Sequence, residues 1–289
     1  MDIRSTLRSL FGEERALAAV GVLGLALAAG TAVVALLRGT VVPPGGDLTK
    51  PISFDAAVGI WVLSIAALLP YADFGRRGRS VWRAAFAAAM VYFYLGETWP
   101  AFRGHDPRFF ADDFGMLDRR IATFFGVDAG VVILLFLILA SRWFTRRARE
   151  RAPELVVGAR WAAPSTVVAL AVGGWMIAME GRVVGEGGSA LWPHAIGFHA
   201  LQAVPLVGWL AGRCGSGTGP VHVAGALWLS AVALALAQAA AGIPPLAPSA
   251  AGAGALASLA GWTGVAIYLA GRRPASEAPA PAAGIRPPG

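Results

Sequence analysis

The sequence predicts an all-α integral membrane protein, a bundle of about eight transmembrane helices with both termini in the cytoplasm. Three observations lead to this fold class. Hydrophobic residues make up 56% of the 289 residues and charged residues only 14%, which is too apolar for an ordinary soluble domain. Apolar runs of about 20 residues, long enough to cross a bilayer core of ~30 Å, recur along the chain. Basic residues gather in alternate connections between these runs.

The first apolar run, residues 16–37, is longer than the hydrophobic part of a secretory signal, so we expect an uncleaved span. The same length criterion predicts seven further spans, at residues 53–72, 84–102, 121–142, 162–180, 193–212, 220–241 and 250–271. The chain then divides into a cytoplasmic N-terminal segment (1–15), a polytopic helical domain (16–271) and a cytoplasmic tail (272–289), whose Pro/Ala-rich sequence indicates disorder. No convincing internal repeat is visible at this level.

The distribution of positive charge predicts the orientation. Of the 24 Lys and Arg residues, 17 lie in the two terminal segments and in every second connection, as the positive-inside rule requires of cytoplasmic segments. The net charge of +7 is therefore a topology signal, and nucleic acid is not an expected partner. The expected location is a bacterial cytoplasmic membrane, and the expected partners are the lipid bilayer and, as an open alternative, other membrane subunits. The single cysteine, Cys214, excludes an intrachain disulfide.

Ionisable side chains inside the predicted spans fall mostly in the outer half of the membrane. Such residues are costly in hydrocarbon and therefore indicate a functional site. The six positions come from five spans, and they would converge if those helices share one bundle: Asp55, Glu97, Asp128, Glu180, His194 and His199. We therefore predict an outward-facing site within the membrane. For Asp55, capping of the start of the second span is the alternative interpretation.

Imidazole and carboxylate groups together suit a transition metal, so we predict a site for Fe, Cu or Zn with His194, His199, Glu97 and Glu180 as ligands. A single haem with one histidine ligand is a second possibility. Glu97, Asp128 and Gln202 are the expected catalytic or supporting residues. His194 and His199 are about 140° apart on a helix, so both reach one metal only if the helix start at Pro193 is irregular, whereas His199 and Gln202 share a face. The structural alternative is that these side chains form hydrogen bonds that only hold helices together.

Three functions are compatible with this site. The first is a metal- or haem-dependent membrane oxidoreductase that acts on a lipophilic or outer-side substrate. The second is a proton- or ion-coupled transporter, in which Asp128, Glu97 and His199 would relay protons. The third is a structural or assembly subunit of a membrane complex. The connection at residues 103–113, with its cations, acids and His105, is a candidate lid or substrate entrance above the site. The alternative interpretation is a solvated connection whose aromatic residues rest in the membrane interface.

Overall fold

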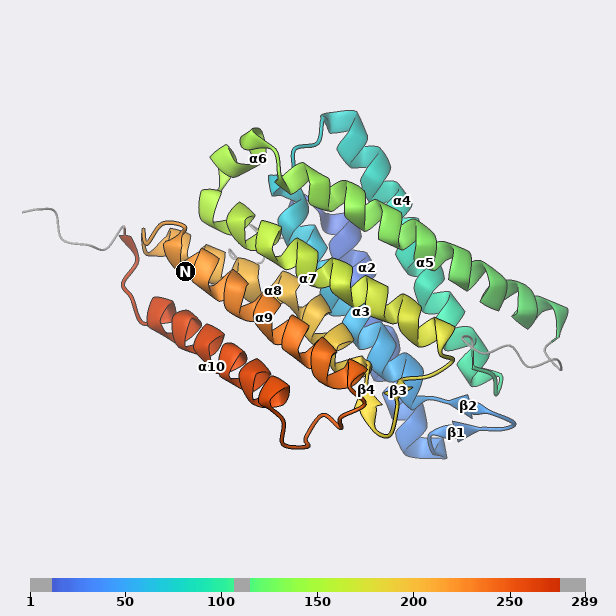
Figure 1. The fold of residues 1–289 in the computed structure, drawn as a ribbon. Helices are drawn as coiled ribbons and strands as arrows, with labels where there is room; N and C mark the ends of the chain where they lie inside the picture. The colour runs from blue at the N-terminus through green and yellow to red at the C-terminus, as the bar shows by residue number, and fades with distance from the viewer. Residues whose placement is uncertain (1–11, 107–114, 276–289) are drawn as a thin grey trace, which may run out of the picture.

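The computed structural model describes residues 12–106 and 115–275 as a bundle of long helices with two short β-hairpins (Figure 1). The helices are α2 (Arg15–Arg38), α3 (Thr49–Leu68), α4 (Arg76–Phe102), α5 (Met116–Trp143), α6 (Arg146–Arg151), α7 (Pro153–Ala178), α8 (Leu191–Arg213), α9 (Gly219–Ala240) and α10 (Ala250–Ala270), with a 3-10 turn, η1 (Leu69–Tyr71). Strands β1 (Val41–Val42) and β2 (Gly46–Asp47) form one antiparallel hairpin, and β3 (Val183–Val184) and β4 (Gly188–Ser189) form the other. Most of the segments predicted as the N-terminal segment and the tail lie outside the described residues.

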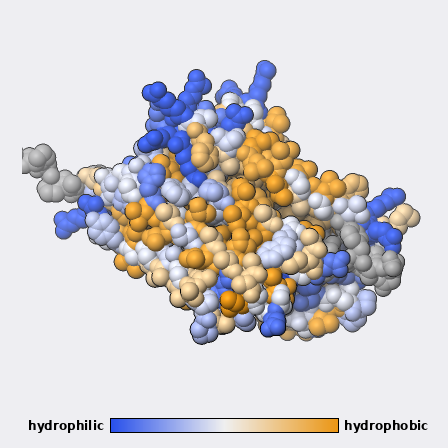
Figure 2. Space-filling model, in the orientation of Figure 1, coloured by the Kyte–Doolittle hydropathy of each residue, from blue (hydrophilic) through white to orange (hydrophobic). Residues whose placement is uncertain are grey.

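Seven helices in the described part of the chain are long and apolar enough to cross a membrane, which confirms the class of multi-pass helical membrane protein. They are α2, α3 with η1, α5, α7, α8, α9 and α10. The helix predicted at residues 84–102 forms as α4 and is 27 residues long, but it is not among the seven because its sequence is amphipathic rather than uniformly apolar. The flank of the bundle is largely hydrophobic, and hydrophilic atoms gather mainly towards its ends (Figure 2).

The two ends of the bundle differ in their chemistry. At one end, Arg79 Nε donates a 2.6 Å hydrogen bond to Glu14, which joins the start of α4 to the start of α2. There too, Arg160 Nε donates to the Trp143 carbonyl at 2.8 Å, which joins the start of α7 to the end of α5. Arg272 lies at this end as well, where it donates to the Ser216 hydroxyl at 2.9 Å. We name this the basic end and the opposite one the hairpin end. Both ends of the described chain therefore lie at the basic end.

The two hairpins reveal an internal repeat that the sequence analysis missed. Each follows a long helix and precedes another: α2, β1, β2 and α3 in the first half correspond to α7, β3, β4 and α8 in the second. Each half continues with two more long helices, α4 and α5 or α9 and α10. Backbone bonds recur at matching positions, since Leu48 N donates to Thr40 O at 2.8 Å and Ala190 N donates to Arg182 O at 2.9 Å. The expectation of no internal repeat is therefore wrong.

A pair of glycines in each half explains why the hairpin packs in the same way twice. A Cβ on Gly46 would collide with the Ala101 carbonyl and lie 2.8 Å from the Cα of Gly104, which has a positive φ of 83°. In the second half, a Cβ on Gly188 would collide with the Ala239 carbonyl and lie 2.9 Å from the Cα of Gly242, where φ is 71°. The hairpin therefore closes over the end of α4 or α9 only because these positions carry no side chain.

The core joins the two halves through aromatic rings. Trp61 on α3 is 4% exposed, and its ring centroid lies 5.6 Å from that of Phe86, 5.8 Å from that of Phe136 and 5.5 Å from that of Phe198. These rings come from α4, α5 and α8, so one tryptophan contacts three other helices. Trp82 stacks on Phe86 at 4.8 Å and extends this layer towards the basic end.

Candidate functional site

Asp55 lies fully buried on α3, in the first half of the molecule. It is the seventh residue of the helix, about 9 Å from the helix start at a rise of 1.5 Å per residue. Thr98 Oγ1 donates a 2.7 Å hydrogen bond to Asp55 Oδ2, whereas Asp55 Oδ1 is buried without any hydrogen-bond partner. The helix start is occupied instead by Asp47, whose Oδ1 accepts a 2.9 Å bond from the Thr49 backbone. Asp55 therefore lies within a helix that is long and apolar enough to cross a membrane, and the alternative that it caps the second span is wrong.

Helix α4 supplies the other members of this site. Tyr94, Glu97 and Thr98 are spaced i, i+3 and i+4, so they lie on one face of α4. Tyr94 and Glu97 are at most 1% exposed, and both lie close enough to Asp55 for an electrostatic interaction. The Tyr94 hydroxyl has no hydrogen-bond partner and faces α2, where a Cβ on Gly24 would lie 2.5 Å from it. We name Asp55, Tyr94, Glu97 and Thr98 the Asp55 site.

Charged residues lie between the Asp55 site and the hairpin end. Asp118, at the start of α5, is 1% exposed and pairs with Arg103 at 2.9 Å. Trp99 Nε1 donates to the same carboxylate at 3.2 Å, and His105 Nε2 lies 3.9 Å from it. Lys50 forms an ion pair with Asp106. The start of the connection predicted as a cover, residues 103–106, therefore takes part in ion pairs, and residues 107–113 lie outside the described part.

Asp128, on α5, lies near a different face of α4. Its Oδ2 is buried without a hydrogen-bond partner, and it interacts electrostatically with Tyr92. Tyr92 precedes Tyr94 by two residues, which places the two side chains about 160° apart around the helix. Asp128 therefore faces a side of α4 that points away from Tyr94, and its predicted grouping with Glu97 stays a prediction.

The two histidines of α8 have different hydrogen-bond partners. His194 Nδ1 lies 2.8 Å from the Ala169 carbonyl on α7, where the ring also packs on Phe198 at 4.9 Å. His199 Nδ1 lies 3.0 Å from Gln202 Oε1, and Gln202 Nε2 donates to Ser64 on α3 at 2.7 Å. The helix runs regularly through both positions, so the irregular start that a shared metal would require is absent.

The predicted metal ligands do not form one cluster. Glu180 lies exposed beyond the end of α7, with a positive φ of 51°, whereas Glu97 belongs to the Asp55 site in the other half. Within residues 12–106 and 115–275, no group of three or more His, Cys, Asp or Glu side chains is placed to hold a metal ion. A transition metal or haem as cofactor stays a prediction that the described residues do not support.

The Asp55 site has no counterpart in the second half. Counting along α8 and α9 from the matched hairpin residues, the equivalent positions are Gly197, Val232, Ala235 and Leu236. The two halves therefore share their helix arrangement, but only the first half carries the buried acidic and hydroxyl side chains. Of the four site residues, the sequence analysis singled out Glu97 and Asp55, and it missed Tyr94 and Thr98 because hydroxyl groups are common in membrane helices. Tyr94 precedes Glu97 by three residues and Thr98 follows Tyr94 by four, so this spacing could have predicted that the three side chains share one face of the helix.

Fold and site together define the class: a multi-pass helical membrane protein of two equivalent halves, with a buried acidic site in the first half. No family model, curated protein or solved structure matches the chain.

Proposed function

We propose that the protein is a proton- or ion-coupled membrane transporter, and that the Asp55 site binds the coupling proton or cation. Buried Asp55, with one carboxylate oxygen unpartnered, is the observation that carries the proposal. An ionised carboxylate without a partner is costly in a low-dielectric interior, and a second carboxylate at Glu97 within electrostatic range raises that cost. A bound proton or a small monovalent cation would offset this cost.

The same residues would supply a suitable set of ligands for a cation. Carboxylate oxygens of Asp55 and Glu97 and the hydroxyls of Tyr94 and Thr98 are hard oxygen donors, which alkali cations prefer over nitrogen or sulfur. The side chains come from two helices, α3 and α4, so a small relative movement of these helices would change the affinity. In this proposal, a transported solute gains access from the hairpin end, past the ion pairs of Lys50 and Asp118.

The aromatic layer around Trp61 would act as the inner barrier. Trp61 is six residues beyond Asp55, about 9 Å further towards the basic end. Its contacts with Phe86, Phe136 and Phe198 fill the centre of the bundle, and α8 of the second half contributes one of these rings. Movement of one half against the other would separate Phe198 from Trp61 and open the site towards the basic end.

We infer an eight-span topology for this transporter, with the basic end in the cytoplasm and both termini on that side. The start of α4 is tied to the start of α2 through Glu14, and Ala101 near its end packs on the hairpin that follows α2. Helix α4 thus runs the same length of the bundle as α2, which supports it as the eighth span. The arginines at the basic end agree with a cytoplasmic location in a bacterial inner membrane.

Ligand-dependent thermal stability of the detergent-purified protein tests the proposal. A proton or cation that binds the folded protein alone stabilises it, so the melting temperature of the wild type should rise with Na⁺, K⁺ or Li⁺, or with falling pH between about 8 and 5. Asp55→Asn should abolish the response to cations and weaken the response to pH, because Asp128 is a second carboxylate with an unpartnered buried oxygen. Asp128→Asn is the matched control, since it also removes such a carboxylate but leaves the Asp55 site intact, and it should preserve the response to cations.

Transport itself is tested in proteoliposomes that contain a pH-sensitive dye, with an imposed cation gradient or membrane potential. The wild type and Asp128→Asn should dissipate the gradient, and Asp55→Asn should match empty liposomes. An identical thermal response in the wild type and Asp55→Asn would show that the coupling ion binds elsewhere or not at all.

A further inference from the structure

His199 lies near the middle of α8 and on the surface of the molecule. It is the ninth of the 23 residues of a helix that is apolar enough to cross a membrane, about 12 Å from the helix start at a rise of 1.5 Å per residue. Half of a bilayer core measures about 15 Å, so this position lies at the depth of the acyl chains. The side chain is exposed, and it therefore faces the membrane interior or a molecule dissolved there.

A chain of hydrogen bonds fixes the tautomer of this imidazole. The Ser64 hydroxyl donates to the Ile60 carbonyl on α3 at 2.8 Å, and its oxygen accepts a 2.7 Å bond from Gln202 Nε2. Gln202 Oε1 then lies 3.0 Å from His199 Nδ1. Because an amide oxygen only accepts, Nδ1 carries the proton and donates, and Nε2 of the neutral ring presents a lone pair. Within residues 12–106 and 115–275, no group forms a hydrogen bond with this lone pair.

Holding the two halves together does not require His199. The bond between α3 and α8 is made by Gln202 and Ser64, whereas the bond of His199 stays within α8. In the first half, the positions equivalent to His199 and Gln202, counted from the hairpin glycines, are Ala57 and Ile60. The helix arrangement is therefore compatible with apolar side chains at both positions. An exposed imidazole with an unpaired lone pair is costly in hydrocarbon, which indicates a ligand that supplies a donor.

We propose that His199 binds a membrane-soluble quinol, the reduced form of a quinone, through the quinol hydroxyl group. The phenolic O–H would donate to Nε2, and the ring would lie on the surface of α8 near the middle of the membrane. Phospholipid acyl chains carry no donor at this depth, whereas an isoprenoid quinol dissolves in the membrane interior. The oxidised quinone has carbonyl oxygens that only accept, so it would face a lone pair and form no hydrogen bond. The site therefore selects the reduced form.

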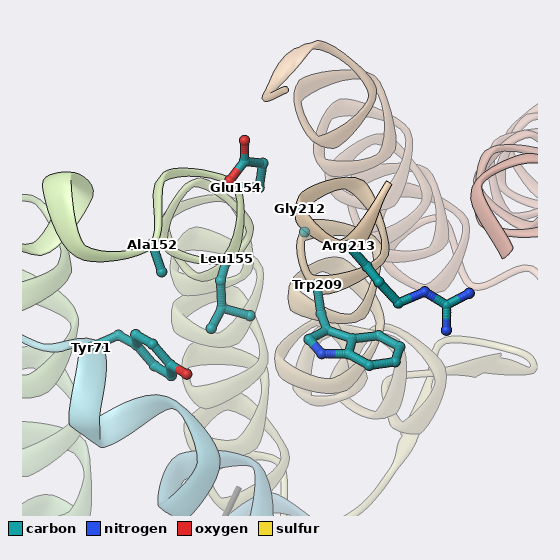
Figure 3. Close-up of a pocket in the computed structure, with 8 residues that line it drawn as sticks. Tyr71, Ala152, Glu154, Leu155, Trp209, Gly212 and Arg213 are labelled. Atoms are coloured by element: carbon teal, nitrogen blue, oxygen red, sulfur yellow. The ribbon is translucent and has the colours of Figure 1, made fainter. Parts of the chain in front are cut away.

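The contact between α3 and α8 leads to a pocket of about 340 Å³ at the basic end. Tyr71 and Trp209 line this pocket, and each lies seven residues beyond a member of the contact, Ser64 or Gln202. That separation corresponds to about 10 Å along a helix. Leu155 on α7 lies between the two aromatic side chains, so much of the wall is apolar (Figure 3). The isoprenoid chain of the quinol would run along this contact and reach the pocket.

This site is separate from the Asp55 site. Ser64 follows Asp55 by nine residues, which corresponds to 900° of helical rotation, or 180° after two full turns. The two side chains therefore lie on opposite faces of α3, and quinol binding does not depend on the proposed transport function.

Native mass spectrometry of the full chain in detergent, prepared without oxygen, tests the proposal. Three probes are added to separate samples: decylubiquinol, decylubiquinone and the dimethyl ether of decylubiquinol, which keeps the ring and chain but has no O–H. The wild type should retain the quinol about tenfold better than either of the others, the effect of about one hydrogen bond. His199→Phe should lose this preference. His222→Phe is the matched control and should keep it, because His222 is also exposed but bonds to Trp161 at the start of α9.

Gln202→Leu distinguishes the orientation of the imidazole from its presence. Without the amide oxygen, His199 can turn an N–H outwards, so retention of the quinone should rise towards that of the quinol. Equal retention of the quinol and its dimethyl ether by the wild type would overturn the proposal, and so would an unchanged preference in His199→Phe. The same spectra report the oligomeric state. Conversion of a dimer into a monomer by His199→Phe would assign this face to a second copy of the chain and overturn the proposal as well.

Discussion

Thr98 Oγ1 donates a 2.7 Å hydrogen bond to one carboxylate oxygen of Asp55, and the other oxygen has no partner. This bond joins α3 to α4 in the interior of the first half. Because it is the single hydrogen bond that the structure shows for the Asp55 carboxylate, its removal should have a measurable effect.

Thr98→Val should therefore lower the free energy of unfolding by about 1–3 kcal/mol, the usual cost of leaving a buried polar group without a partner. In an Asp55→Asn background the same substitution should cost less, since a neutral amide is cheaper to bury than a carboxylate. Thr123→Val is a suitable control, because the Thr123 hydroxyl is exposed and bonds only to Arg119 within its own helix. Denaturant unfolding in detergent measures Thr98→Val, Asp55→Asn, the double variant and Thr123→Val. If the costs of Thr98→Val and Asp55→Asn simply add in the double variant, the Thr98–Asp55 hydrogen bond does not contribute to stability.

The two hairpin glycines should respond alike to substitution. Gly46→Ala and Gly188→Ala each place a Cβ against a carbonyl oxygen and a glycine Cα, so each should destabilise the protein by about 1–3 kcal/mol through overpacking. Gly130→Ala on α5 is the control, since a Cβ there meets no atom within 4 Å. It should be neutral or stabilising by up to about 1 kcal/mol, the helix-propensity gain of alanine over glycine. A cost in only one of the two hairpins would show that the halves are not equivalent.

Glu13 and Glu14 share Arg79 but differ in burial, so they form a natural pair for measurement. Glu14 is fully buried and lies 2.6 Å from Arg79 and 3.3 Å from Arg83, whereas the Glu13 side chain is 68% exposed. Glu14→Gln should cost about 2–3 kcal/mol, slightly below the range for breaking a fully buried pair, because both arginines are partly exposed. Glu13→Gln should cost less than about 1 kcal/mol. Thermal unfolding distinguishes them, and similar costs would show that burial of Glu14 is unimportant.

The Asp47 carboxylate lies outside the spans and provides a pH-dependent contribution. Its side chain accepts hydrogen bonds from the Thr49 hydroxyl and backbone, which hold its pKa below the ordinary value of 3.8. A lowered pKa in the folded state means that the stabilisation is complete above pH 3.8 and is lost as the pH falls through the folded-state pKa. Carboxyl NMR titration should give a value below 3.8, and Thr49→Ala should move it upwards. An unchanged titration in Thr49→Ala would contradict this assignment.

Metal content distinguishes the transporter proposal from the oxidoreductase predicted from the sequence. Elemental analysis and an absorption spectrum of the purified protein should show no stoichiometric Fe, Cu or Zn and no haem, because His194 bonds to Ala169 on α7 whereas His199 bonds to Gln202 on its own helix. Near-stoichiometric metal that is lost in a folded His199→Ala variant would instead favour the oxidoreductase and argue against the transporter.

Helix positions could be predicted well, because the length of an apolar run is a local property of the chain. The span predicted at 193–212 forms as Leu191–Arg213, and that predicted at 220–241 forms as Gly219–Ala240. The repeat was also present in the sequence. Residues 39–51 and 181–193 share six identical positions of 13, including both valines of each hairpin and the glycines at 46 and 188, but this match is short and lies in a connection.

The site could be predicted only in part. By itself, the sequence determined the apolar spans, the separation of charge between alternate connections and the depth of each ionisable residue, since these depend on residue order and helix rise alone. The tertiary structure decided which of those residues meet. Glu97 faces Asp55, and Asp128 lies across α4 from them. His194 bonds to α7, whereas His199 bonds to Gln202 on α8. Depth places a residue along the membrane normal, whereas contact depends on how each helix is rotated about its axis, which only packing against its neighbours determines.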